Sequence, residues 1–143
     1  MKNKMVVKFD SLSENECFAR NVIASFLMPL NPSIGVLSDI KTAVSEAVTN
    51  VVVHAYGSDE SGIMQIECRV DKQNRTIEIV VRDFGKGIAD VKEAIEPFFT
   101  TAASDERSGM GFTIIETFMD EMDVTSVVGE GTVVRMKKVI KEC

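Results

Sequence analysis

The segment Glu46-Ala-Val-Thr-Asn50 carries two side chains that could contact a charged ligand. It lies inside a long stretch with helical periodicity, so its carboxylate and its amide, four residues apart, stack on one another along the helix surface. The small Ala43 and Ala47 beside them leave room for a ligand. The same pair also fits a solvated helix surface, because short motifs of this kind often occur without a function.

A second candidate is the segment Asp83-Phe-Gly85-Lys-Gly87, which follows a β-rich run. The carboxylate of Asp83 is expected at the exit of a strand, where two glycines let backbone approach a ligand closely. A flat base with an exocyclic amine could donate to this carboxylate, although a plain glycine turn that begins with Asp is the alternative. A eukaryotic-type protein kinase is excluded, since the chain is too short and lacks the Val-Ala-Ile-Lys and His-Arg-Asp signatures.

The third candidate is Gly109-Met110-Gly111, which precedes an apolar helical run. Free backbone N–H groups and the helix dipole at such a start attract anions, and Arg107 and Ser108 could add a positive charge and a hydroxyl. No Gly-Lys-Ser/Thr follows, so this is not a Walker loop, and a flexible helix entry is the alternative. Together, the three segments describe a nucleotide site with places for a metal, a base and a phosphate chain.

These segments must be positioned by an α+β fold. Helices are predicted at residues 14–28, 34–55 and 112–119, with a short one near 91–95, and strands at 5–9, 63–70, 76–82, 124–128 and 132–139. Ser13 with Glu16 forms a capping-box pattern, and Ser33 is placed to cap the second helix. The order of elements predicts a two-layer sandwich with a mostly antiparallel, mixed sheet and helices on one face.

Composition limits the kind of protein. With 143 residues, the chain suits a single domain over 1–143, large enough for a core without disulfides or metals. A net charge of −6 without a Lys/Arg block argues against direct binding to nucleic acid. No apolar run is long enough to span a membrane, and no signal peptide is apparent, so a cytoplasmic protein is expected. Three cysteines without paired spacing indicate reduced thiols.

The three segments, in this order and with Gly129-Glu-Gly131-Thr132 after them, resemble the ATP-binding domain shared by type II topoisomerases, Hsp90-type chaperones, histidine kinases and MutL-type proteins. The resemblance covers about residues 34–136. Within that superfamily, the compact length and the string Glu46-Ala-Val-Thr-Asn-Val-Val-Val-His-Ala-Tyr56 are most similar to bacterial anti-sigma factors with serine-kinase activity.

The resemblance implies a role for each motif residue. Glu46 would be the general base, Asn50 would coordinate Mg²⁺ on the phosphates of ATP, and Asp83 would accept the adenine amino group. The other expected nucleotide contacts are Gly85, Gly87, Arg107, Ser108, Gly109, Met110, Gly111 and Thr132, and residues 88–108 would act as a lid. His54, one turn after Asn50, is interpreted as structural.

The resemblance also implies partners. The chain would inhibit a sporulation sigma factor, phosphorylate a serine of an anti-anti-sigma protein and form a homodimer. Helix 14–28 is predicted to turn Phe18, Val22, Ile23 and Phe26 inward, which leaves Arg20 on a small outer patch as a candidate partner contact.

Three other functions are compatible with these residues. The alternatives are an ATP-hydrolysing module of a larger assembly, the catalytic half of a histidine kinase, and a binding module that only sequesters its partner. The residue types alone do not separate a kinase from a hydrolase, because Glu46 could act on a serine hydroxyl or on water.

Overall fold

A computed structural model describes residues 2–56, 62–96 and 111–140 of the chain. Its frame is a five-stranded sheet in which every neighbouring pair is antiparallel. The strands are β1 (Lys2–Asp10), β2 (Ile63–Asp71), β3 (Thr76–Asp83), β4 (Glu121–Val127) and β5 (Gly131–Val139), in the spatial order β1-β2-β3-β5-β4. Both predicted hairpins, 63–82 and 124–139, are therefore confirmed.

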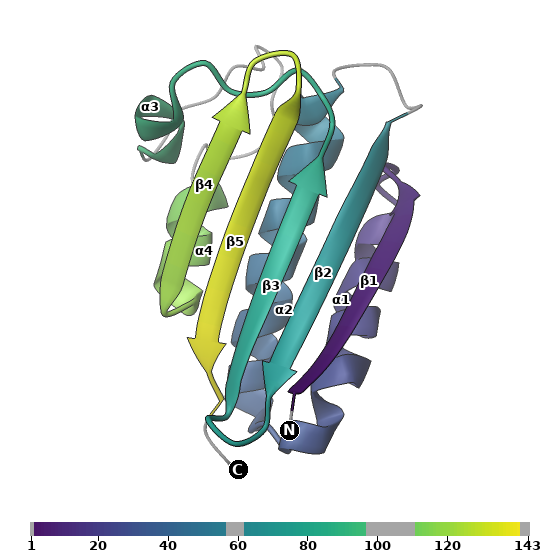
Figure 1. Ribbon diagram of the computed structural model, residues 1–143, viewed down its shortest axis with the longest axis vertical. Coiled ribbons are helices and arrows are strands. Elements are labelled where there is room, and N and C mark those ends of the chain that lie inside the picture. The colour runs from purple at the N-terminus through teal and green to yellow at the C-terminus, as the bar shows by residue number, and fades with distance from the viewer. Residues whose placement is uncertain (1, 57–61, 97–110, 141–143) are drawn as a thin grey trace.

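The helices lie on one face of this sheet (Figure 1). They are α1 (Asn15–Leu27), the 3-10 turn η1 (Met28–Leu30), α2 (Ile34–Asn50), the π-helical turn η2 (Val51–Ala55), α3 (Val91–Ile95) and α4 (Gly111–Phe118). α1 and α4 both pack against α2. The predicted α+β two-layer sandwich is confirmed, and the sheet pairings are antiparallel throughout rather than mixed.

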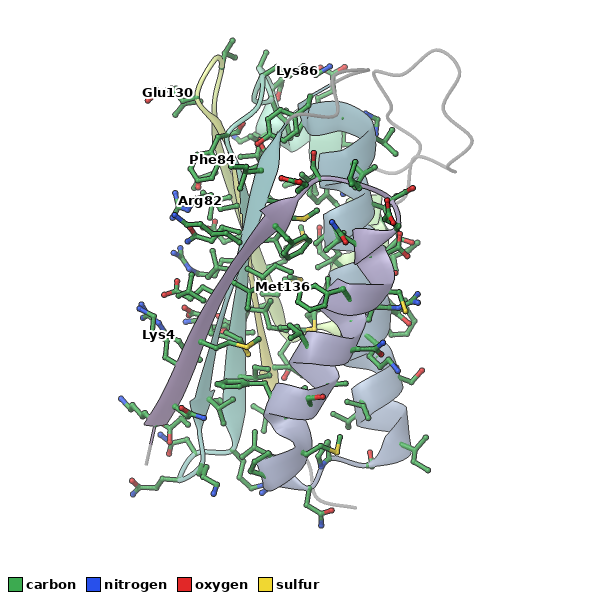
Figure 2. All side chains as sticks on the ribbon, turned by 90° about the vertical axis from the view of Figure 1, so that its right-hand side faces the viewer. Lys4, Arg82, Phe84, Lys86, Glu130 and Met136 are labelled. Atoms are coloured by element: carbon green, nitrogen blue, oxygen red, sulfur yellow. The ribbon has the colours of Figure 1, made fainter. Side chains whose placement is uncertain are left out.

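The core lies between the two layers and is built by the expected periodicities. Alternate residues of β3, namely Ile77, Ile79 and Val81, are buried against the helices. α2 contributes Ile40, Val44 and Val48. Figure 2 shows Met136 of β5 between the layers, whereas Lys4 and Arg82 point away from the helices. One apolar core therefore fills the space between the sheet and the helices, and polar groups lie at one end of it.

The starts of the two long helices differ from one another. Ser33 caps α2 as predicted, because its hydroxyl accepts a hydrogen bond from the Val36 amide at 3.2 Å. The predicted capping box of Ser13 and Glu16 is wrong: α1 has no side-chain cap, and the Glu16 amide donates to the Ser13 carbonyl instead. The Glu16 carboxylate is directed to α2, where it accepts from the Ser45 hydroxyl at 2.5 Å.

The inward face of α1 also differs from the prediction in one residue. Ala19, Ile23 and Leu27 are buried, whereas Phe18 is 45% exposed. Its ring packs edge-on against Phe9 of β1, with centroids 5.5 Å apart. Phe18 therefore covers the rim of the sheet and does not enter the core.

Candidate functional site

The helix-facing side of the sheet changes from apolar to polar at one end. One cross-strand row contains Val81, Val134 and Val124, which neighbour each other in the register of β3, β5 and β4. Two residues further along the strands, the corresponding positions are Asp83, Thr132 and Ser126. Ser126 lies opposite Thr132 in the β4–β5 register, and the Thr132 amide donates to Asp83 Oδ1 at 3.2 Å. The sheet thus presents three adjacent polar side chains at its rim.

The carboxylate of Asp83 is held by backbone amides, and the residue is only 7% exposed. Its Oδ1 accepts a second hydrogen bond from the Gly85 amide at 3.0 Å. Burial raises the pKa of this carboxyl, and the amides of Gly85 and Thr132 offset part of that rise. Among the described residues, both hydrogen bonds end on Oδ1, so Oδ2 is available to a donor on a ligand.

The glycine turn after β3 is fixed by the chain itself. Lys86 donates its amide to the Ala55 carbonyl at 2.9 Å and accepts from the Gly129 amide at 2.8 Å. A Cβ atom at Gly85 would overlap with the Ala55 carbonyl, and Gly87 has a φ of 77°. These glycines are therefore required by contacts with η2 and with the β4–β5 turn, whichever ligand approaches the turn.

Tyr56 supports the same turn from the end of η2. Its hydroxyl accepts from the Phe84 amide at 2.8 Å and donates to the Ile63 carbonyl at 2.5 Å. A Cβ atom at Gly62 would overlap with the Tyr56 ring, so this glycine lets the ring lie flat on the chain. Tyr56 lies at the end of the string 46–56, and no role was predicted for it.

The helical side of the site is formed by α2 and the start of α4. Glu46 and Asn50 lie one turn apart on α2, and Glu46 Oε2 and Asn50 Nδ2 are both buried. Asn50 Nδ2 has no hydrogen-bond partner in the part of the chain that the structure describes. Leaving such a donor buried without a partner costs about 1–3 kcal/mol, and an acceptor on a ligand, such as a phosphate oxygen, would remove this cost.

Gly111 closes the space above the Asn50 amide. A Cβ atom at Gly111 would lie 3.0 Å from Asn50 Oδ1 and 3.1 Å from Nδ2. The first residue of α4 and the end of α2 are thus in direct contact, which brings the first and third predicted segments together. The expected open ledge at Ala43 and Ala47 is wrong, because both side chains are buried in the core at 0% and 1% exposure.

Several predicted site residues lie outside the described residues. They are Arg107, Ser108, Gly109 and Met110, together with most of the predicted lid at 88–108. Thr132 and Gly85 lie beside Asp83, and their backbone amides donate to its carboxylate. Within residues 2–56, 62–96 and 111–140, no cluster of three or more His, Cys, Asp or Glu side chains could hold a metal ion by itself. Among the described residues, a metal held by Asn50 would therefore need further ligands, such as phosphates and water.

Arg20 lies on α1 beside a groove that leads to the site. Its Nη1 is 3.6 Å from Glu16 Oε1, and Glu16 Oε2 accepts from the Thr49 hydroxyl at 2.8 Å. Arg20, Ser45 and Glu46 line one open groove of about 480 Å³ between α1 and α2. The predicted partner contact and the predicted base therefore share a surface.

Cys17 and Cys68 are both free, and burial raises the pKa of the Cys68 thiol to about 12, so this thiol is inert. None of the helices that the structure describes is long and apolar enough to cross a membrane.

Comparison with known proteins defines the class of the domain first. Residues 12–138 match the histidine kinase-like ATPase domain, which implies that the site accepts a nucleotide. The RsbU and RsbW domains of Rv1364c from Mycobacterium tuberculosis superimpose with a TM-score of 0.70 at 17% identity, over 96% of this chain and 32% of theirs. The catalytic domain of the histidine kinase ThkA gives 0.59 at 17% identity, over 95% and 96%. These structures share the fold.

The family within that class follows from curated relatives. The anti-sigma F factor of Caldanaerobacter subterraneus subsp. tengcongensis is 52% identical over 96% of this chain and 94% of its own length. Those of Anoxybacillus flavithermus and Clostridium novyi are 49% and 50% identical over similar shares, 96% and 93% for the first and 97% and 96% for the second. The chain belongs to the family of anti-sigma F factors.

Proposed function

We propose that the protein is an anti-sigma factor that binds and inhibits a sporulation sigma factor and phosphorylates a serine of its anti-anti-sigma partner with Mg-ATP. Family membership supports the sigma-factor partner. The observation that carries the enzymatic part is the pair on α2, a carboxylate one turn before a buried amide whose nitrogen has no partner among the described residues.

The two sides of the site suit the two ends of ATP. The free Oδ2 of Asp83 would accept the adenine amino group, with Thr132 and the turn at Gly85 and Gly87 forming the base side of the pocket. The backbone N–H groups of Gly109, Met110 and Gly111 would contact the phosphates. Arg107 and Ser108 would add a positive charge and a hydroxyl. The Asn50 amide oxygen would complete the coordination of Mg²⁺, which supplies charge neutralisation on the phosphates.

Glu46 is proposed as the general base of the transfer. It would accept the proton of the serine hydroxyl as the serine oxygen forms its bond to the γ-phosphorus and the bond to the β,γ-bridging oxygen breaks, releasing ADP. The groove that Glu46 shares with Arg20 offers a path by which a docked protein could bring its serine to this carboxylate. In this arrangement α1 and α2 would position the acceptor serine.

Transfer of labelled γ-phosphate from ATP to the anti-anti-sigma protein tests this function. We expect Glu46→Gln to lower transfer by about 10²–10⁴-fold while ATP still binds, because only the base is lost. Glu116→Gln on α4 is the matched control, since Glu116 is an exposed helical glutamate. Undiminished transfer by Glu46→Gln would refute the assigned base. Rapid ATP turnover without any protein acceptor would favour the alternative, an ATP-hydrolysing module of a larger assembly.

A homodimer is proposed as the assembly, acting in the cytoplasm where its sigma factor operates. The sheet face away from the helices carries charged side chains of both signs, such as Lys4 and Glu67, whose Nζ and Oε1 atoms are 2.8 Å apart. Lys4 points to this side in Figure 2. A two-fold interface sets the same patch against itself, which a surface with both signs allows. Light scattering should give twice the chain mass of 15.7 kDa, and a monomer at working concentration would contradict the proposal.

A further inference from the structure

Ser126 lies behind the base side of the site and belongs to none of the predicted motifs. Its hydroxyl oxygen makes three contacts: the Ile88 amide donates to it at 2.7 Å, the Gly131 carbonyl accepts from it at 3.0 Å, and Thr132 Oγ1 is 2.8 Å away. Ser126 is thus joined to Asp83 through Thr132, whose amide donates to the Asp83 carboxylate.

The valence of a hydroxyl decides the direction of the third contact. Ser126 has one proton and two lone pairs. The Ile88 N–H can only donate and the Gly131 carbonyl can only accept, so these partners take one lone pair and the single proton. The remaining lone pair must accept from Thr132, and therefore the Thr132 hydroxyl proton is committed to Ser126. Thr132 Oγ1 then has only lone pairs left for any further contact.

We propose that Ser126 is a positioning residue that fixes this proton order and thereby makes the base pocket select a 6-amino purine over a 6-oxo purine. The inference rests on the proposed nucleotide function. Because the Thr132 hydroxyl donates its proton to Ser126, both Asp83 and Thr132 can act only as acceptors toward a bound base. An exocyclic amine donates to such a pocket, whereas a 6-oxo group would bring its own lone pairs against it.

Removal of the Ser126 hydroxyl frees the Thr132 proton to turn toward a ligand. The test measures dissociation constants of ATP and ITP, which differ at the 6-position, for the full chain by competition with a fluorescent ATP analogue. We expect wild type to prefer ATP, and Ser126→Ala to reduce the ATP/ITP preference by about tenfold, the effect of one neutral hydrogen bond. Ser126→Thr keeps the hydroxyl and should keep the preference.

Two further variants separate this role from general stability. Thr125→Ala removes the exposed hydroxyl of the adjacent, outward-facing residue and should leave the ratio unchanged. If Ser126→Ala does not fold, Ser126→Cys, of similar size but with a weak donor, should show an intermediate ratio. A wild-type ratio in the folded alanine or cysteine variant overturns the inference, as does equal binding of ATP and ITP by wild type. Absence of ATP binding by wild type would instead overturn the proposed function.

Discussion

Replacing Gly111 with alanine tests whether the Asn50 amide is the point at which the phosphate end of a nucleotide is held. The new Cβ would lie 3.0 Å from Asn50 Oδ1 and 3.1 Å from Nδ2, whereas ordinary contacts lie at 3.4–4 Å. The amide must therefore move by a few tenths of an ångström. If this amide serves a charged ligand, loss of its contact costs about 1.5–3 kcal/mol, which corresponds to binding weakened by roughly 10- to 150-fold.

Gly35 provides a matched control for this substitution. It lies in the first turn of α2, as Gly111 lies in the first turn of α4, and a Cβ atom at Gly35 meets nothing within 4 Å. Both changes raise helix propensity, by up to about 1 kcal/mol, but only Gly111→Ala touches the site. Gly35→Ala should therefore raise the melting temperature and leave nucleotide affinity unchanged.

Isothermal titration with ATP and Mg²⁺, beside thermal unfolding of each apo variant, distinguishes the two effects. The expected result is weaker binding by Gly111→Ala alone, with both variants folded. If Gly111→Ala bound Mg-ATP as tightly as wild type, the assignment of Asn50 to the metal and phosphates would be refuted.

Three further substitutions probe the rim and the partner surface. Burial raises the pKa of Asp83, so the folded chain holds this proton more tightly than the unfolded chain, and stability is lost as the pH rises above the ordinary value of 3.8. Asp83→Asn should therefore unfold at higher denaturant concentration than wild type at pH 7 but not below pH 3.8, while binding ATP more weakly; an equal difference at every pH would contradict this. Tyr56→Phe removes the hydroxyl that joins the Phe84 amide to the Ile63 carbonyl and should lower the free energy of unfolding by about 1 kcal/mol in urea titrations. Arg20→Ala should weaken capture of the sigma factor in a pull-down without changing ATP affinity, and undiminished capture would discard Arg20 as a partner contact.

Local features of the fold could be predicted because they depend on neighbours in sequence. Ser33 caps α2 within one turn, and the alternation of Ile77, Ile79 and Val81 identifies the buried face of β3. The position of Asp83 at the end of that strand was predictable for the same reason. The hydrophobic pattern does not predict that β5 lies between β3 and β4, because antiparallel pairing is compatible with several spatial orders of the strands.

Contacts between distant segments account for the missed parts of the site. Glu16 fits a capping box locally, yet it is bound by hydroxyls on α2 that lie 29 and 33 residues away. Ser126 carries no motif, and its role depends on Ile88, 38 residues earlier. One signal was available: a hairpin centred on Gly129 places Ser126 opposite Thr132, on the same face of β4 as the buried Val124.

The position of β1 at the edge of the sheet bears on the order in which the chain can fold. β1 pairs with β2 in nine aligned positions, from Lys2 with Asp71 to Asp10 with Ile63. During synthesis the first strand therefore lacks its complete partner until residue 71 has left the ribosome, although α1 and α2 can form earlier. Such non-local pairing slows folding. We expect β1 to join the sheet late, which refolding followed by pulsed amide exchange would show as delayed protection of Met5 and Val7.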